Sequence, residues 1–157
     1  MTGFELFAVR RDWNRASDRD WADVLARLPL FEGIGKRDLQ RIAREAEFAE
    51  FGPGDHVVSI GDQPDFFYVI LSGEAHAAAK PAARPLTTGD SFGEMGLIGG
   101  EPRSATIVAA TELHVMRLPR RAFDDVLDRH PAIGRRLLHE LAGRVRTLEH
   151  QAARPAS

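Results

Sequence analysis

The chain contains the run Phe92-Gly93-Glu94-Met95-Gly96-Leu97-Ile98-Gly99-Gly100-Glu101-Pro102-Arg103-Ser104-Ala105-Thr106-Ile107-Val108, which is too apolar for an ordinary surface loop. Within it an acid, Glu94, stands nine residues before a base, Arg103. The guanidinium of Arg103 is a planar fork of donors that matches two oxygens of a phosphate. An ionised Glu94 only accepts hydrogen bonds, so it suits a hydroxyl and would repel the phosphate. The two charges therefore indicate a small ligand with an anionic end and a hydroxyl beside it.

Other residues of this run also favour an anion. Gly93 and Gly96 let the backbone approach a ligand without a side chain in the way. A short helical turn is expected to start near Glu94, and the free N–H groups at such a start attract negative charge. Ser104 adds a hydroxyl donor. The residues alone leave a second interpretation open, in which Glu94 and Arg103 form a structural ion pair on a glycine-rich loop.

The complete run closely resembles the phosphate-binding cassette of the cyclic nucleotide-binding domain family. The family pattern is Phe-Gly-Glu-(Leu/Met)-(Ala/Gly)-Leu, a short spacer and (Pro)-Arg-(Ala/Ser/Thr)-Ala-Thr, and residues 92–97 and 102–106 fit it without a gap. Four other segments resemble further turns of the family, in order, at 51–55, 60–62, 68–74 and 88–90. The likeness extends from about Leu28 to Glu149 and includes catabolite-activator-like and protein-kinase-regulatory-subunit-like branches.

The resemblance implies a mainly β fold with flanking helices: an antiparallel jelly-roll β-barrel with N-terminal helices and two C-terminal helices. It also implies a cyclic nucleotide as ligand. In the family, Ala or Ser after the cassette arginine goes with adenine, so Ser104 favours cyclic AMP, and cyclic GMP is the alternative. The ligand-binding residues that it implies are Gly93, Glu94, Met95, Gly96, Arg103, Ser104 and Ala105. A possible lid over the base falls at Thr147, Leu148 and Glu149.

The rest of the sequence predicts helices on either side of a β region. Ser17 is expected to cap a first helix, and a second begins at about Lys36. Between Glu47 and Leu118, short apolar or alternating runs separated by Gly, Pro and Asp predict many strands. Pro119 and Pro131 each suit the first position of a C-terminal helix.

These elements suggest the following organisation. We expect an N-terminal extension at 1–16, a cyclic nucleotide-binding domain at 17–150 and a disordered tail at 151–157. Within the domain, helices occupy 17–47, the barrel occupies 48–118 with the cassette at 92–106, and the C-terminal helices occupy 119–150.

The segment from His76 to Leu86 departs from the family, which usually has a β-branched hairpin there. It is rich in alanine, which has a poor strand propensity, and Pro85 lacks a donor for a β ladder. We therefore expect this hairpin to be weak or to lie at a sheet edge.

The last predicted helix carries an apolar seam. Leu138, Leu141, Val145 and Leu148 recur at spacings of three, four and three residues, as in two heptads. The seam either packs on the barrel or forms a homodimer through paired helices, as the catabolite-activator branch implies.

Composition limits the function. The chain of 157 residues has a net charge near −2, so nothing favours general nucleic-acid binding. It has no cysteine, which excludes disulfides, thiol catalysis and thiolate metal sites. The histidines show no metal-ligand spacing, and no apolar run approaches the ~20 residues of a membrane span. We expect a cytoplasmic protein without a metal or membrane contact.

We therefore expect a stand-alone regulatory module that binds a cyclic nucleotide and changes conformation towards an unknown protein partner. Fewer than ten residues follow the last predicted helix, so no DNA-binding domain is expected. No nucleophile–base pair or metal cluster is evident, so we expect neither an enzyme nor a cofactor. The alternative is a ligand-independent interaction and dimerisation module of the same fold.

Overall fold

The computed structural model describes residues 12–63, 65–80, 84–93, 103, 105–136, 138–139 and 142–143. Among these residues, four short helical elements come first, and they are followed by seven strands and a further helix. In chain order these elements are η1 (Trp13–Arg15), α2 (Asp18–Ala26), η2 (Pro29–Phe31), α3 (Lys36–Ala43), β1 (Glu47–Phe51), β2 (His56–Val58), β3 (Phe66–Ser72), β4 (Ala75–Ala77), β5 (Ser91–Phe92), β6 (Ile107–Ala109), β7 (Leu113–Pro119) and α5 (Arg120–Arg129).

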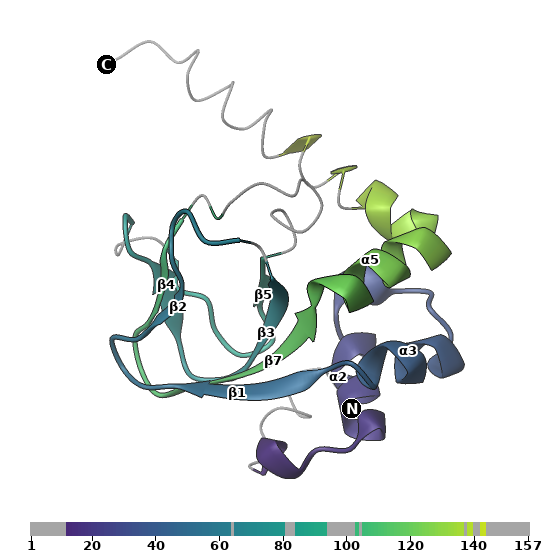
Figure 1. Cartoon of the computed structure of the whole chain (residues 1–157), viewed down its shortest axis with the longest axis horizontal. Helices are drawn as coiled ribbons and strands as arrows, with labels where there is room; N and C mark the ends of the chain where they lie inside the picture. Colours follow the sequence, from purple (N-terminus) through teal and green to yellow (C-terminus); the bar gives the residue numbers. More distant parts are fainter. Residues whose placement is uncertain are drawn as a thin grey trace.

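The strands form two antiparallel sheets. The four-stranded sheet has the order β1-β7-β3-β5, and the three-stranded sheet has the order β2-β6-β4. Figure 1 shows the helices gathered at one side of the strands. The prediction of a mainly β fold with flanking helices is confirmed. Among the described residues no strand is shared by the two sheets, so the strand region is an open sandwich rather than a closed barrel.

The first long helix begins where the sequence predicts it. Ser17 caps α2 through a reciprocal capping box, in which Asp20 N–H donates to Ser17 Oγ and the Asp20 carboxylate accepts from Ser17 N–H at 2.7 Å. Trp21 then packs on Trp13, with the ring centroids 5.5 Å apart. Trp13 therefore joins the helical core, although it lies within the predicted N-terminal extension.

Strand β3 is buried on both faces, which explains its unbroken apolar sequence. Phe67, Val69 and Leu71 pack in a cluster with the helices. Tyr68 and Ile70 point the other way, into a second cluster with residues of the three-stranded sheet. The alternation of side chains along a strand thus connects the helical layer with the interior of the sandwich.

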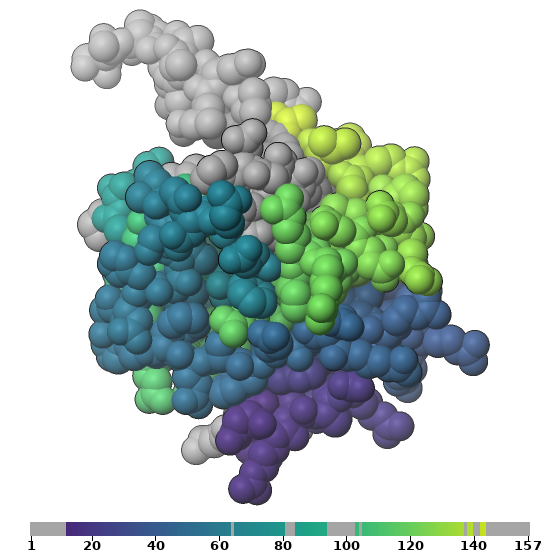
Figure 2. Space-filling model, viewed as in Figure 1, coloured from purple at the N-terminus to yellow at the C-terminus, as the bar shows by residue number. Residues whose placement is uncertain are grey.

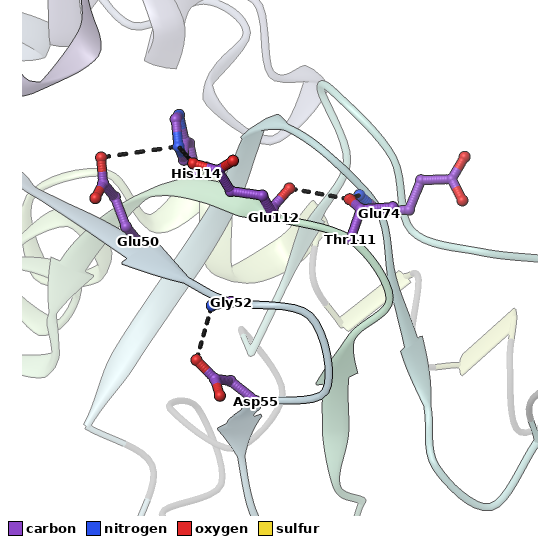
Figure 3. Close-up of polar contacts among 7 residues, drawn as sticks. All are labelled: Glu50, Gly52, Asp55, Glu74, Thr111, Glu112 and His114. Carbon is purple, nitrogen blue, oxygen red and sulfur yellow. Dashed lines mark hydrogen bonds and ion pairs between the residues drawn. The ribbon is translucent and has the colours of Figure 1, made fainter.

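Turns near one end of the sandwich are held by side chains (Figure 3). The Asp55 carboxylate accepts from Gly52 N–H at 2.7 Å, and Thr111 Oγ1 accepts from Glu74 N–H at 3.0 Å. The Thr111 hydroxyl also donates to the Glu112 carbonyl at 2.9 Å. These bonds satisfy backbone groups that the β ladders leave unpaired.

The alanine-rich hairpin is weak, as predicted. Strand β4 has only three residues and forms the edge of its sheet. Its pairing with the returning chain is an isolated bridge between Ala75 and Leu86.

The C-terminal helices follow β7. The prediction that Pro119 is the first helical residue is wrong by one position: Pro119 ends β7 and is the N-cap of α5. A second helical segment occupies 131–136 and begins at Pro131, as predicted. In Figure 2, the green and yellow-green surface of these helices lies against the blue surface of α3. Arg121 pairs with Glu45 at 2.9 Å across this boundary.

The end of the described chain exposes the first residue of the apolar seam. The Leu138 residue is 60% exposed. Leu141, Val145 and Leu148 lie outside the described residues. In the described part of the chain, no helix has the length and apolar character needed to cross a membrane.

Candidate functional site

Arg103 is fixed at the backbone by the turn that precedes β3. Its N–H donates to the Asp62 carbonyl at 2.7 Å, and its carbonyl accepts from Gly61 N–H at 2.8 Å. The turn is itself closed by the Asp62 carboxylate, which accepts from Ser59 N–H at 3.0 Å. The neighbouring Thr106 Oγ1 accepts from Ile60 N–H at 2.9 Å. Hydrogen bonds between residues 60–62 and residues 103–106 therefore fix the backbone position of Arg103.

The side chain of Arg103 points inward. The residue is only 8% exposed and is the one buried charged residue among those described. Nη1 donates to the Gly93 carbonyl at 3.0 Å, and Nη2 donates to the Phe66 carbonyl. Both acceptors are backbone carbonyl oxygens, so these two bonds fix the direction of the guanidinium.

Gly93 must be glycine for this arrangement to form. Its φ is +96°, in the region that side chains disfavour. A Cβ atom at this position would lie 2.9 Å from the Phe66 carbonyl oxygen and 3.0 Å from Arg103 Nη1. The groups that lie close to Gly93 are the Phe66 carbonyl and the cassette arginine, and the approach of a ligand to this glycine stays a prediction.

An aromatic group lies beside Arg103 in the sandwich. Tyr68 stacks on Phe92 with centroids 4.9 Å apart and ring planes at 9°. Arg117 lies over the Phe66 ring, 4.3 Å from its centroid. Burial raises the pKa of Tyr68 above its ordinary value, and this rise is partly opposed by the positive charges of Arg117 and Arg103. The charge of Arg103 therefore acts on the Tyr68 hydroxyl inside the sandwich.

The structure describes only part of the predicted site. It brings Gly93 and Arg103 together, and it leaves Ala105 exposed. Glu94, Met95, Gly96 and Ser104, the helical turn expected at Glu94, and the possible lid Thr147, Leu148 and Glu149 lie outside the described residues. Both interpretations of Glu94 and Arg103, a ligand-binding pair and a structural ion pair, therefore stay predictions.

Sequence reasoning did not identify Tyr68, Phe66 and Arg117 as neighbours of the cassette arginine. One signal was available: alternation along Phe66-Phe67-Tyr68 places the first and third rings on the same face. The position of Arg117 had no comparable signal, because it depends on the pairing of β7 with β3.

A second polar group surrounds His114 of β7, which lies opposite Glu50 of β1. His114 Nε2 is 3.1 Å from Glu112 Oε1 and 3.7 Å from Glu50 Oε1 (Figure 3). Within the described ranges, no three His, Cys, Asp or Glu side chains are arranged so as to hold a metal ion.

Comparison with known proteins identifies the family. The profile of the cyclic nucleotide-binding domain matches residues 48–130, more than half of the chain. The chain therefore belongs to the cyclic nucleotide-binding domain family, and the predicted family is confirmed.

Two curated relatives illustrate the range of the family. The cAMP-dependent protein kinase regulatory subunit of Colletotrichum orbiculare is 33% identical over 125 residues, which cover 78% of this chain and 32% of that protein. A cyclic nucleotide-gated potassium channel of Mesorhizobium japonicum is 34% identical over 132 residues, which cover 84% of this chain and 36% of that protein. The chain thus spans about a third of the length of these relatives.

Solved structures agree in fold. The regulatory domain of Toxoplasma gondii PKA, determined with cAMP, aligns with a TM-score of 0.65 and 25% identity over 81% of this chain and 50% of that one. The two molecules share the arrangement of antiparallel sheets and flanking helices.

Proposed function

We propose that this chain binds a cyclic nucleotide, cyclic AMP, and acts as a regulatory module without a chemical step of its own. The observation that carries the proposal is the buried guanidinium of Arg103, which neutral carbonyl oxygens of Gly93 and Phe66 hold in a fixed direction. A buried positive charge fixed in advance suits an anionic ligand, because little ordering is left to be done when the ligand binds.

The remaining contacts follow from the cassette. Arg103 and Ser104 hold the phosphate, and Glu94 accepts from the ribose 2′-hydroxyl. Backbone groups of Gly93, Met95 and Gly96, together with Ala105, complete the contact. Thr147, Leu148 and Glu149 close over the base as a lid.

The preference for cyclic AMP is supported by Ser104 and by the cAMP-dependent relatives. Cyclic GMP is the alternative ligand. The regulatory role is supported by the same relatives, and it requires that the ligand bind two conformations of the protein with different affinity. The protein partner is not specified by the sequence.

We also propose that the C-terminal helix forms a homodimer contact. Leu138 is 60% exposed, as expected for a seam that faces another chain. An exposed leucine is common on protein surfaces, so the proposal depends on the whole seam rather than on this one residue.

A ligand-independent interaction module of the same fold is the second candidate. The observation in its favour is the short edge strand β4, because its hairpin would provide little contact surface for the base of a nucleotide. In that case the protein would fold and bind a partner equally well with and without nucleotide.

Calorimetric titration tests the proposed function. Protein refolded after complete unfolding is titrated with cyclic AMP, cyclic GMP and linear 5′-AMP, since unfolding releases nucleotide carried through purification. We expect binding of cyclic AMP at one site per chain, weaker binding of cyclic GMP and much weaker binding of 5′-AMP. Correctly refolded protein that binds none of them would favour the ligand-independent module.

A further inference from the structure

Four side chains form a continuous row across the four-stranded sheet. Glu47 of β1 is paired with Arg117 of β7, Arg117 with Tyr68 of β3, and Tyr68 with Phe92 of β5. Directly opposed residues on neighbouring antiparallel strands point to the same face. We call these residues, Glu47, Arg117, Tyr68 and Phe92, the transverse row.

Each member of the transverse row contacts the next. Arg117 Nε donates to Glu47 Oε2 at 2.9 Å. Arg117 lies directly opposite Tyr68 on the neighbouring strand, close enough to act on the Tyr68 hydroxyl and lower its pKa. Tyr68 stacks on Phe92 with nearly parallel rings, 4.9 Å between centroids. The row therefore joins the strand that follows the helical layer to the strand that begins the cassette.

The transverse row adjoins both groups that hold the cassette arginine. Phe92 directly precedes Gly93, whose carbonyl accepts from Arg103 Nη1 at 3.0 Å. The guanidinium of Arg117 lies 4.3 Å from the ring centroid of Phe66, whose carbonyl accepts from Arg103 Nη2. Both acceptors thus belong to residues that the row touches or adjoins.

We infer that Arg117 and Glu47 are positioning residues of the ligand site: through Phe66, Tyr68 and Phe92 they keep the two carbonyl oxygens where they orient Arg103. The inference rests on the proposed function, because it assigns these residues a role in the same site. Neither residue needs to touch the ligand.

A purely structural ion pair is the competing explanation. The side chains of Arg117 and Glu47 are 30% and 47% exposed, and ion pairs with this exposure contribute little to folding. Replacing Arg117 should therefore leave the fold intact. An effect on ligand affinity would have to pass through the ring of Phe66 and the hydroxyl of Tyr68.

The chain offers a matched control. Arg121 and Glu45 form another arginine–glutamate pair, also at 2.9 Å, with Arg121 80% exposed. This pair joins α5 to the segment before β1 and is not part of the transverse row. Substitutions at either pair remove one member of an arginine–glutamate ion pair, and only Arg117 and Glu47 belong to the transverse row.

The test compares Arg117→Met with Arg121→Met. By calorimetry, Arg117→Met is expected to raise the Kd for cyclic AMP by about two- to thirtyfold, as for contacts coupled at a distance, and Arg121→Met to change it less than about twofold. Glu47→Gln and Glu45→Gln repeat the comparison from the other member of each pair, in case Arg117→Met does not fold.

A second readout needs no ligand. Tyr68 is the only tyrosine in the chain, so the ultraviolet absorbance of phenolate reports on this residue alone. Because Arg117 lowers the pKa of Tyr68, Arg117→Met should raise it, whereas Arg121→Met should not.

The outcomes separate the two proposals. If the wild type binds neither cyclic nucleotide, the proposed function fails. If the wild type binds cyclic AMP and folded Arg117→Met binds it as tightly as Arg121→Met, the proposed function stands and the positioning role is overturned. A selective loss of affinity in Arg117→Met, together with the shifted Tyr68 titration, supports the inference.

Discussion

Replacing Gly93 by alanine introduces a methyl group where Arg103 meets the backbone. The new Cβ would lie 2.9 Å from the Phe66 carbonyl oxygen, which belongs to a paired strand, and 3.0 Å from Arg103 Nη1. The carbonyl can yield little, because its strand is hydrogen-bonded on both sides. The arginine is the more mobile of the two, so we expect it to move away from its present direction.

The size of the effect can be worked out in two parts. An alanine at a φ of +96° costs about 1–3 kcal/mol of folding free energy. Loss of one hydrogen bond to a charged group costs about 1.5–3 kcal/mol, which is roughly a ten- to hundredfold increase in the Kd for cyclic AMP. Both parts lower stability, but we expect only the second, which releases Arg103 from its present direction, to lower affinity as well.

Gly54→Ala separates these two parts. Gly54 also has a positive φ, of +87°, but a Cβ atom there would meet nothing within 4 Å. Both variants should lose free energy of unfolding in urea, Gly93→Ala more than Gly54→Ala because only Gly93→Ala also meets neighbouring atoms, and only Gly93→Ala should lose affinity in calorimetry. Equal affinities for folded Gly93→Ala and Gly54→Ala would refute the close packing of Gly93 on Arg103.

Three further predictions follow from other parts of the molecule. Burial raises the pKa of Tyr68 above 10.0, so the folded protein keeps this proton more tightly than the unfolded chain; the contribution to stability is complete below that pH and is lost as pH rises through the folded pKa. Urea unfolding on both sides of pH 10.0 should show a smaller alkaline loss in Tyr68→Phe than in the wild type, and identical losses would contradict this assignment. Glu94→Gln should weaken cyclic AMP binding and reduce the preference over the 2′-deoxy ligand; a wild type that binds both ligands equally would show that Glu94 does not contact that hydroxyl. Leu141→Asp combined with Val145→Asp should give monomers in sedimentation, and a wild type that is already monomeric ends the dimer proposal.

Local sequence signals predicted the features that depend on neighbouring residues. Ser17 and Asp20 form the expected cap because their spacing places each side chain beside the other's backbone N–H. The weak hairpin at β4 follows from its alanines, which add little packing to a strand. The cassette predicted the family, because its run of glycines, one acid and one base matches the family pattern without a gap.

Features that depend on strand pairing could not be predicted in the same way. The transverse row requires Arg117 to lie opposite both Glu47 and Tyr68, and nothing within β7 encodes that register. The open sandwich likewise depends on which edge strands pair, and the alternation along each strand is the same in a barrel. The predicted start of α5 at Pro119 is one residue too early, because the proline φ of −61° suits both an N-cap and a first helical position.

The most direct test of the central claim is the affinity of Arg103→Leu for cyclic AMP, measured by calorimetry on refolded protein beside the wild type. If the guanidinium holds the phosphate, removing a buried charged partner costs about 2–5 kcal/mol, so the Kd should rise roughly tens- to thousands-fold while the fold remains. A folded Arg103→Leu protein that binds cyclic AMP as tightly as the wild type would contradict the account.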